Sequence, residues 1–439
     1  MITGHLNQGA GPDFAEDLRE AGAGEELIAL LGRCVAQKAD RRPVSAAAVV
    51  EKLAPLAPTL KSVSPLPAEP ARPTVVPDKP PPPQTPVRSL ERAPEEEASE
   101  KEDASTQVKI GFQHAQQQDY SEAMRWFKLA AEQKNATAQC NIGWLYAYGQ
   151  GVGQDYSEAM RWFKLAAEQK NPDAQSAIGG MYGEGMGVGQ DYSEAMRWFK
   201  LAADQGYANG QYCIGILYSR GQGVRQDYAE AMKWYKMAAD QGNPVAQSCI
   251  GSLYHNGQGV QQDYTEAMRW YKMAADQGDA NAQYCIGTFY HNGQGVRQDY
   301  AEAMRWYKMA ADLGQADAQC NMGYLYHNGY GGKQDYAKAM KWYKKAAEQG
   351  VSKAQTCIGC LYRDGKGVRQ DYSEAMRWFK MAADQGDANA QHCIGFLYND
   401  GQGVTKDRDE AIRWFQKAAE QGHLMAKKMA KPLLLRPFI

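Results

Sequence analysis

Thiol side chains recur in one column of the sequence, at multiples of 36 residues. The members of this column are Cys213, Cys249, Cys285, Cys357 and Cys393. Neighbouring helices pack about 8–10 Å apart, whereas a disulfide requires Cα atoms about 4.4–6.8 Å apart. We therefore predict free thiols that pack as small hydrophobic residues, rather than a ladder of disulfides.

Two further patterns resemble fragments of metal sites. Cys357 and Cys360 form a C-x-x-C pair, but no second pair accompanies it, which disfavours zinc. His255, His291 and His327 recur 36 residues apart. A metal requires its nitrogen ligands at about 2.0–2.1 Å, and histidines one helical level apart, about 10 Å, cannot easily share an ion. We expect no metal and no cofactor.

Catalytic constellations are missing from the sequence. No Ser/His/Asp grouping or paired carboxylate recurs outside a helix-capping pattern. The chain also contains no glycine-rich loop, V-A-I-K lysine, H-R-D or D-F-G of a protein kinase. Without the metal-holding and base aspartates, phosphoryl transfer cannot be assembled. The chain is therefore predicted not to be an enzyme.

Composition excludes two further classes. The 439 residues include 49 Lys and Arg against 51 Asp and Glu, a net charge of -2, whereas nucleic-acid binding requires a basic surface. No apolar run approaches the roughly 18 residues of a membrane span, and the first residues lack the pattern of a signal peptide. We expect no nucleic-acid partner, no membrane insertion and a cytoplasmic location.

The element that must position these residues is a 36-residue repeat. Eight units cover residues 138–425 and share the pattern A-Q-x-C-I-G-x-L-Y-x-x-G-x-G-V-x-Q-D-Y-x-E-A-M-R-W-Y-K-M-A-A-D-Q-G. Residues 106–137 form a shortened first hairpin that resembles a tetratricopeptide unit. Residues 426–439 begin one more helix, which Pro432 is expected to stop, and cap the last hairpin.

Each unit encodes two helices, called helix A and helix B. In the fifth unit, Ala282, Ile286 and Phe289 form one buried stripe of helix A, and Gly287 is expected to admit another backbone closely. Asp299 is predicted to cap helix B in a capping box with Glu302. Because one hairpin cannot bury both stripes alone, the units must stack into an all-α solenoid.

These units closely resemble the Sel-1-like repeat (SLR) family. The A-x-x-x-[IL]-G-x-[LFM]-Y-x-x-G-x-G-V frame and the W-[YF]-x-x-A-A-x-x-G ending carry the match. The resemblance implies a right-handed superhelix used as a protein–protein interaction scaffold, often in bacterial signalling. Cysteine-rich relatives join two cysteines within each repeat, whereas most units here have one. Gly332 and Arg408 depart from the repeat and put the loops of their units in doubt.

The first 105 residues have a different character. Residues 1–53 resemble the last two helices of a bacterial Ser/Thr protein kinase C-lobe, with Arg42 and Pro43 at the late Arg-Pro of that family. Residues 54–105 are predicted to be a disordered linker, first proline-rich and then acidic. The order of these parts suggests a kinase module in cis, and it predicts kinase motifs encoded in frame upstream.

Variation among the units points to a binding surface. The third, seventh and tenth positions of helix A differ from unit to unit and share one side of the helix, which lines the concave groove of a helical-hairpin solenoid. We call these positions the variable face. Its candidate partner-binding residues are Trp144, Tyr212, Ile216, Tyr284, Tyr324, His392, Phe396, His255, His291, His327 and Arg363. The alternative is drift of an unconstrained surface.

The sequence therefore favours a non-catalytic adaptor that binds a protein or peptide in this groove and is linked to Ser/Thr kinase signalling. Two alternatives remain. The chain could be the substrate-recruiting C-terminal part of a larger Ser/Thr kinase. A cell-wall or carbohydrate-binding protein is the other, although it would be expected to carry a signal peptide and paired cysteines.

Overall fold

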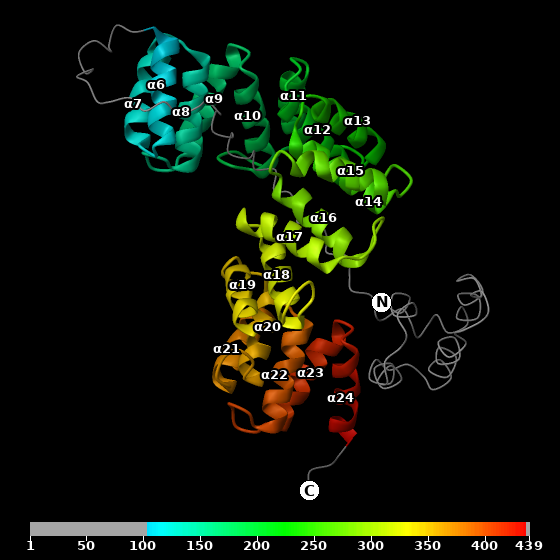
Figure 1. Cartoon of the computed structure of the whole chain (residues 1–439). Helices are drawn as coiled ribbons and strands as arrows, with labels where there is room; N and C mark the ends of the chain where they lie inside the picture. The colour runs from blue at the N-terminus through cyan, green and yellow to red at the C-terminus, as the bar shows by residue number, and fades with distance from the viewer. Residues whose placement is uncertain (1–102, 436–439) are drawn as a thin grey trace, which may run out of the picture. The chain divides into compact units, whose positions relative to one another are not determined.

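The computed structural model describes residues 103–435, which form a series of antiparallel helical hairpins and contain no strand (Figure 1). The kinase-like segment 1–53 and nearly all of the linker 54–105 lie outside the described residues. Helix α6 begins at Ala104, two residues before the expected hairpin boundary, and the Asp103 carboxylate accepts a hydrogen bond from Thr106 N at its start.

Helices A and B alternate along the chain. The A helices are α6 (Ala104–Gln116), α8 (Ala136–Tyr148), α10 (Pro172–Glu184), α12 (Ala208–Arg220), α14 (Pro244–Asn256), α16 (Ala280–Asn292), α18 (Ala316–Asn328), α20 (Ser352–Asp364), α22 (Ala388–Asp400) and α24 (Leu424–Leu435). The B helices are α7 (Tyr120–Glu132), α9 (Tyr156–Glu168), α11 (Tyr192–Ala203), α13 (Tyr228–Asp240), α15 (Tyr264–Ala275), α17 (Tyr300–Asp312), α19 (Tyr336–Glu348), α21 (Tyr372–Asp384) and α23 (Arg408–Glu420). Each B helix packs against the A helix before it and the A helix after it, which confirms the predicted solenoid of hairpins.

One local expectation about a helix end is wrong. Helix α24 continues through Pro432 to Leu435, so this proline does not stop it; proline removes one backbone donor but does not always end a helix. Beside the departures at Gly332 and Arg408 the helices are in place, because α19 begins at Tyr336 and α23 begins at Arg408 itself.

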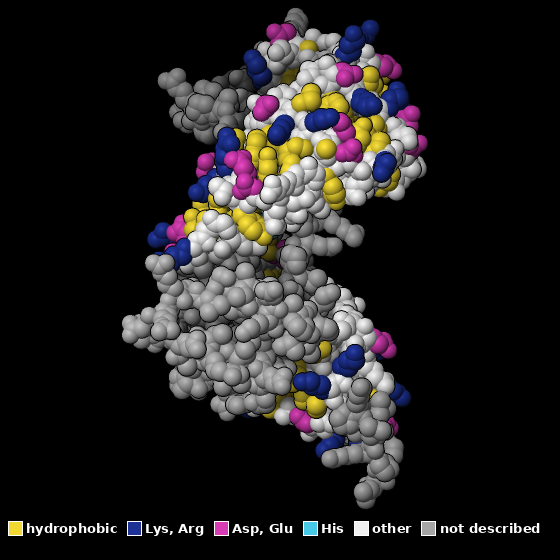
Figure 2. Space-filling model, turned by 90° about the vertical axis from the view of Figure 1, so that its right-hand side faces the viewer, with side chains coloured by type: hydrophobic (Ala, Val, Ile, Leu, Met, Phe, Trp, Pro, Cys, Tyr) yellow, Lys and Arg dark blue, Asp and Glu magenta, His cyan; other side chains and the backbone are white. Residues whose placement is uncertain are grey.

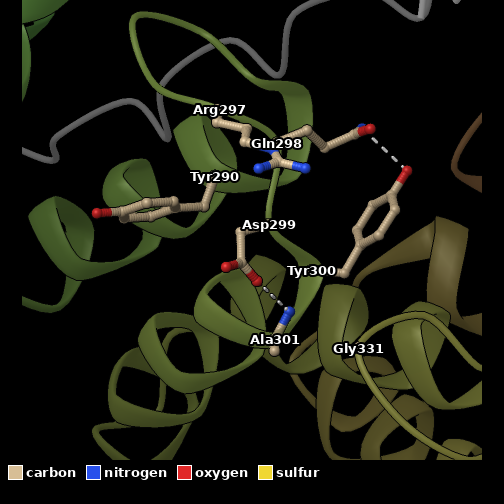
Figure 3. A pocket seen from close by; sticks show the side chains of 7 residues that line it. All are labelled: Tyr290, Arg297, Gln298, Asp299, Tyr300, Ala301 and Gly331. Atoms are coloured by element: carbon tan, nitrogen blue, oxygen red, sulfur yellow. Dashed lines mark hydrogen bonds between the residues drawn. The ribbon is translucent and has the colours of Figure 1, made fainter. Parts of the chain in front are cut away.

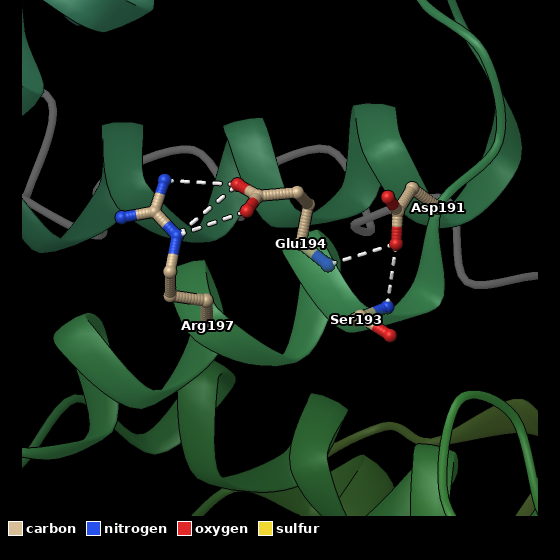
Figure 4. A network of polar contacts seen from close by, with 4 residues as sticks. All are labelled: Asp191, Ser193, Glu194 and Arg197. Carbon is tan, nitrogen blue, oxygen red and sulfur yellow. Dashed lines mark hydrogen bonds and ion pairs between the residues drawn. The ribbon is translucent and has the colours of Figure 1, made fainter.

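Each B helix is capped by an aspartate, but the capping box is only half formed. Asp299 accepts hydrogen bonds from Ala301 N at 2.9 Å and Glu302 N at 3.0 Å. The Asp299 N–H donates to the Tyr290 carbonyl instead of to Glu302, whose carboxylate pairs with Arg305 at 3.0 Å. Figure 4 shows the same arrangement in α11, from Asp191 to Arg197. In a capping box the Asp299 N–H would donate to the Glu302 carboxylate, but here the Tyr290 carbonyl already accepts its hydrogen bond.

The helical glycine of helix A accommodates an aromatic ring, not the backbone that the sequence suggested. A Cβ atom added at Gly287 would lie 2.6 Å from the ring of Tyr307 in α17. The same pairing recurs in the other hairpins of the described chain: Gly111–Phe127, Gly143–Phe163, Gly179–Phe199, Gly215–Tyr235, Gly251–Tyr271, Gly323–Tyr343, Gly359–Phe379 and Gly395–Phe415. Because there is no Cβ, the ring can lie directly against the helix A backbone.

This ring also joins the next repeat. Tyr271 of α15 belongs to one core cluster with Ala282, Ile286 and Phe289 of α16, and its ring meets Phe289 edge to face at 5.8 Å. The buried stripe predicted for helix A is confirmed. Each ring therefore packs between two consecutive A helices and contributes both to its own hairpin and to the interface with the next.

The tryptophan column lies at the interface between repeats. Trp306 is half-buried. It packs against the core between α15, the B helix of the preceding hairpin, and α16, the A helix of its own hairpin. The fully buried position is the following residue, Tyr307. The tryptophan therefore borders the core, and the residue after it fills the core.

A glutamine pair closes all but one of the complete hairpins. A glutamine after helix B donates to a buried glutamine near the start of helix A, as in Gln385–Gln355 at 2.9 Å and Gln241–Gln211 at 2.8 Å. The hairpin of α16 and α17 has Leu313 at the first of these positions, where it is 59% exposed. The Gln283 Oε1 atom in the same hairpin is buried without a hydrogen-bond partner. An unpaired buried polar atom destabilises the fold.

We expect Leu313→Gln to stabilise the array, because it supplies the missing donor to Gln283. The gain should be about 1 kcal/mol, the contribution of a typical hydrogen bond, and it should raise the urea midpoint. Gln385→Leu is the matched control and should lower the midpoint by breaking the same bond elsewhere. An unchanged urea midpoint for Leu313→Gln would show that the Gln283 amide oxygen already accepts a hydrogen bond.

We expect Gly287→Ala to destabilise the hairpin by about 1–3 kcal/mol, as overpacking of a core does, because the new methyl group would overlap the Tyr307 ring. Gly189→Ala is the control, since nothing lies within 4 Å of its added Cβ. Thermal unfolding followed by circular dichroism measures both. Equal melting temperatures for the two variants would contradict the ring contact.

Candidate functional site on the A helices

The structure divides the variable face into three aromatic groups. In the first, Trp144 stacks on Tyr148 at 5.4 Å between ring centroids and meets Phe163 edge to face at 5.0 Å. Tyr212 and Tyr284 each lie against the buried ring of their own hairpin, at 6.1 Å from Tyr235 and 5.8 Å from Tyr307 respectively. Trp144, Tyr212 and Tyr284 are half-buried, so one side of each ring packs while the other is accessible.

Ile216 is a core residue, which corrects its assignment to the partner-binding surface. Its side chain is only 2% exposed and belongs to the cluster around Tyr235. A β-branched aliphatic side chain at the seventh position fills the space between helices instead of facing solvent.

The second group is the largest, and we call it the central cluster: His291, Tyr300, Tyr324 and Tyr330. His291 stacks on Tyr324 of the next repeat at 5.8 Å and 25°. Tyr300 stacks on Tyr330 at 4.6 Å and 11°, and Tyr324 lies 5.9 Å from Tyr330. The Lys353 ammonium lies 6.0 Å from the Tyr324 ring centroid. Four rings from two repeats and one cation therefore form a continuous surface.

Two members of the central cluster were missed by the sequence analysis. Tyr330 is 37% exposed and lies in the loop that also contains Gly332. Most units have glutamine at this position, so a single aromatic departure in the loop was the available signal. Tyr300 begins helix α17, is half-buried and stacks on the ring of this loop residue.

The three histidines that recur 36 residues apart pack against tyrosine rings. His255, His291 and His327 lie 5.3–5.6 Å from the tyrosine that begins the following B helix, Tyr264, Tyr300 and Tyr336. Burial lowers the pKa of all three imidazoles below the ordinary value. The described residues contain no group of three or more side chains suited to hold a metal ion.

The third group lies at the C-terminal end of the described chain. His392 meets Phe396 edge to face at 4.7 Å and lies 4.3 Å from the ring of His423. Arg363 donates to Asp364 at 2.7 Å and to the Cys393 sulfur at 3.6 Å. Burial first, and then the nearby His423 and Arg363, lowers the pKa of His392 to about 4.

A pocket of about 710 Å³ borders the central cluster and is lined by loop residues, among them Arg297, Asp299 and Tyr300 (Figure 3). The Asp299 carboxylate caps helix α17, and Gln298 Nε2 donates to the Tyr300 hydroxyl at 2.9 Å. A second pocket recurs at the corresponding loop two repeats later, beside Gln370 and Asp371. The pocket is therefore a feature of the repeat, and Gln298 and Asp299 in its lining already serve structural roles.

Charge and apolar side chains are mixed on the surface. On the face drawn in Figure 2, Lys and Arg side chains alternate with Asp and Glu around apolar ones, and neither sign forms a continuous field on the described part. Many of these charges pair along helix B, as Arg197 does with Glu194 at 2.8 Å. No described helix has the length and apolar character needed to cross a membrane.

These features define the class as an α-solenoid of stacked helical hairpins. The Sel1 repeat family profile matches nine segments, at residues 110–135, 136–171, 172–207, 208–243, 244–279, 280–315, 316–351, 352–387 and 388–423. The chain therefore belongs to the Sel1 repeat family. Proteins of this family generally act as scaffolds for protein–protein interaction, and the repeat solenoid is typically non-catalytic.

Solved structures agree with this family. The chain is similar to a protective antigen of uropathogenic Escherichia coli strains that displays an SLR fold, with 35% identity over 74% of this chain and 71% of that one and a TM-score of 0.56. It is also similar to a Sel1 repeat protein from Oxalobacter formigenes, with 39% identity over 57% of this chain and 100% of that one and a TM-score of 0.53. No curated protein matches the chain.

The third group predicts a pH dependence of stability. The pKa of His392 is about 4 in the folded chain and near the ordinary 6.5 when unfolded, so between these values the unfolded chain binds a proton that the folded chain does not. Stability is therefore complete above about pH 6.5 and falls as the pH drops toward 4. We expect His392→Tyr to reduce this loss, as measured by urea midpoints at pH 7 and pH 5.

Phe396→Leu is the control for this measurement, because it removes ring packing at the same place without removing a titrating group. It should lower the midpoint equally at both pH values. If the urea midpoint of His392→Tyr falls between pH 7 and pH 5 as much as that of the wild type, other titrating groups cause the pH dependence.

Proposed function

We propose that this chain is a non-catalytic scaffold that binds a protein or peptide partner through the variable face, with the central cluster as its anchor. The observation that carries the proposal is the ordered aromatic surface formed by His291, Tyr300, Tyr324 and Tyr330 across two repeats. Exposed aromatic rings are the side chains that most often dominate binding energy at protein interfaces.

The packing of these rings favours binding over drift. Parallel stacking of Tyr300 on Tyr330 holds two rings in one orientation, so little conformational entropy remains to be lost when a partner binds. Tyr330 stands where five of the eight units have glutamine, and more than a third of its surface is exposed. An unconstrained surface would not be expected to accumulate matching rings from two repeats.

The chemistry of the cluster suggests which part of a partner it contacts. The rings offer a flat apolar surface, and Lys353 places a positive charge at 6.0 Å from the Tyr324 ring centroid. Lys333 is exposed in the same loop as Tyr330. We propose that the partner inserts an apolar or aromatic side chain between the rings and carries an acidic group beside it.

Two parts of the proposal rest on sequence alone. The link to Ser/Thr kinase signalling, including the possibility that the chain belongs to a larger kinase, depends on residues 1–53, which lie outside the described residues. The cytoplasmic location is likewise a prediction made from the sequence. Kinase motifs encoded in frame upstream would support the first part, and fractionation of the producing cells would test the second.

The anchor is tested by returning two of its residues to those of neighbouring repeats. Tyr324→Thr and Tyr330→Gln together install the residues found at these positions in the preceding unit, Thr288 and Gln294. Thr288 accepts a hydrogen bond from the buried Tyr307 hydroxyl, and Thr at position 324 can serve Tyr343 in the same way. We expect the fold to persist and recovery of a bound partner in a quantitative pull-down to fall about tenfold, equivalent to about 1.4 kcal/mol.

Met237→Ser is the matched control, because it removes an exposed apolar side chain from a B helix, outside the variable face. Its partner recovery should stay near that of the wild type. Equal recovery by the double variant and the wild type would reject the central cluster as the anchor.

A further inference from the structure

A pair of thiols lies where helices α20 and α22 of consecutive repeats meet. Cys360 packs against the buried core cluster that contains Cys393. The Arg363 Nη1 atom donates to the Cys393 sulfur at 3.6 Å. Cys360 is half-buried and Cys393 is 8% exposed, so a small reagent has access to one member of the pair while the other is held behind it.

The residue types of this unit place the pair in one core. Where helix B has tyrosine after its tryptophan, the ring packs in the same core as the column cysteine of the next repeat, as in Tyr235–Cys249, Tyr271–Cys285 and Tyr343–Cys357. Helix α21 instead has Phe379, whose ring packs with Cys393 and carries no hydroxyl. The seventh position of the preceding helix A is Cys360, which packs against the same core.

The surroundings separate Cys360 chemically from the other cysteines. The hydrogen bond from Cys393, and then the charge of Arg363, lower the pKa of the Cys360 thiol. Burial raises the pKa of Cys249 and of Cys285 to about 12. The thiolate is the reactive form of cysteine, so Cys360 is the thiol best prepared to react as a nucleophile.

We propose that Cys360 and Cys393 form an oxidisable dithiol, which a hydroperoxide such as hydrogen peroxide converts into a disulfide between the last two full repeats. The Cys360 thiolate attacks one peroxide oxygen, the O–O bond breaks, and the departing hydroxide takes a proton to become water. The Cys393 sulfur then attacks the sulfur of the resulting sulfenic acid. The S–O bond breaks, and hydroxide leaves as water with the Cys393 proton. Two thiols lose two electrons and the peroxide is reduced to two water molecules.

This bond would act on the partner surface described above. Arg363 belongs to the variable face and bonds the Cys393 sulfur in the reduced chain. A disulfide holds its two Cα atoms about 4.4–6.8 Å apart, so oxidation would fix the spacing of α20 and α22. It would also change the contact of the Arg363 side chain, because the Cys393 sulfur that accepts its hydrogen bond would become part of the disulfide.

The test is peptide mapping of the full chain after treatment with hydrogen peroxide and alkylation of the remaining thiols. Trypsin releases residues 354–363 with both Cys357 and Cys360, and residues 381–406 with Cys393. We expect these two peptides to be disulfide-linked in the wild type and in Cys357→Ser. Neither Cys360→Ser nor Cys393→Ser should give the link.

A second measurement separates reactivity from proximity. In the reduced chain, Cys360 should react with iodoacetamide faster than any other described cysteine, and Arg363→Gln should slow it severalfold. A linked peptide that persists in Cys360→Ser would overturn the proposal. So would a wild-type Cys360 that oxidises to sulfonic acid without forming the link.

Discussion

The array depends on one contact, in which the aromatic ring that follows the tryptophan of helix B lies against the glycine of helix A. The ring can occupy this place because glycine has no Cβ; an added Cβ would lie 2.5–2.8 Å from the nearest ring atom. The same ring belongs to the core shared with the next A helix, as Tyr271 does with Ile286 and Phe289. One side chain therefore stabilises the hairpin and its stacking together, so the two cannot vary independently.

This constraint explains where the repeat can change. The glycine of helix A and the aspartate that caps helix B are the same in all eight units, whereas the third, seventh and tenth positions of helix A differ. The variable positions still contact the ring edges, since Tyr284 lies 5.8 Å from Tyr307 and Phe396 lies 5.4 Å from Phe415. Their chemistry is free only on the outward side, which is the side that a partner can contact.

The hairpins, their capping aspartates and the buried stripes could be predicted from the sequence, because each depends on residues within one helical turn or one hairpin. Contacts between repeats could not. Tyr330 reaches Tyr300 across a repeat boundary, and Cys360 reaches Cys393 in the same way; both distances depend on how successive hairpins are rotated. Ile216 shows the opposite error, because its position varies among units although its side chain is buried. Variation alone does not distinguish a surface from a core position that several residues can fill.

The unpaired amide oxygen of Gln283 has a consequence for the array as a whole. In a solenoid each hairpin contacts only its neighbours, so stability is a sum of local terms and cooperativity passes through every hairpin in turn. The hairpin of α16 and α17 lacks its closing glutamine bond, and it also carries His291 and Tyr300 of the central cluster. A partner that binds these rings would stabilise the hairpin that lacks this bond. The repeats on either side of it would then unfold together, as one cooperative unit.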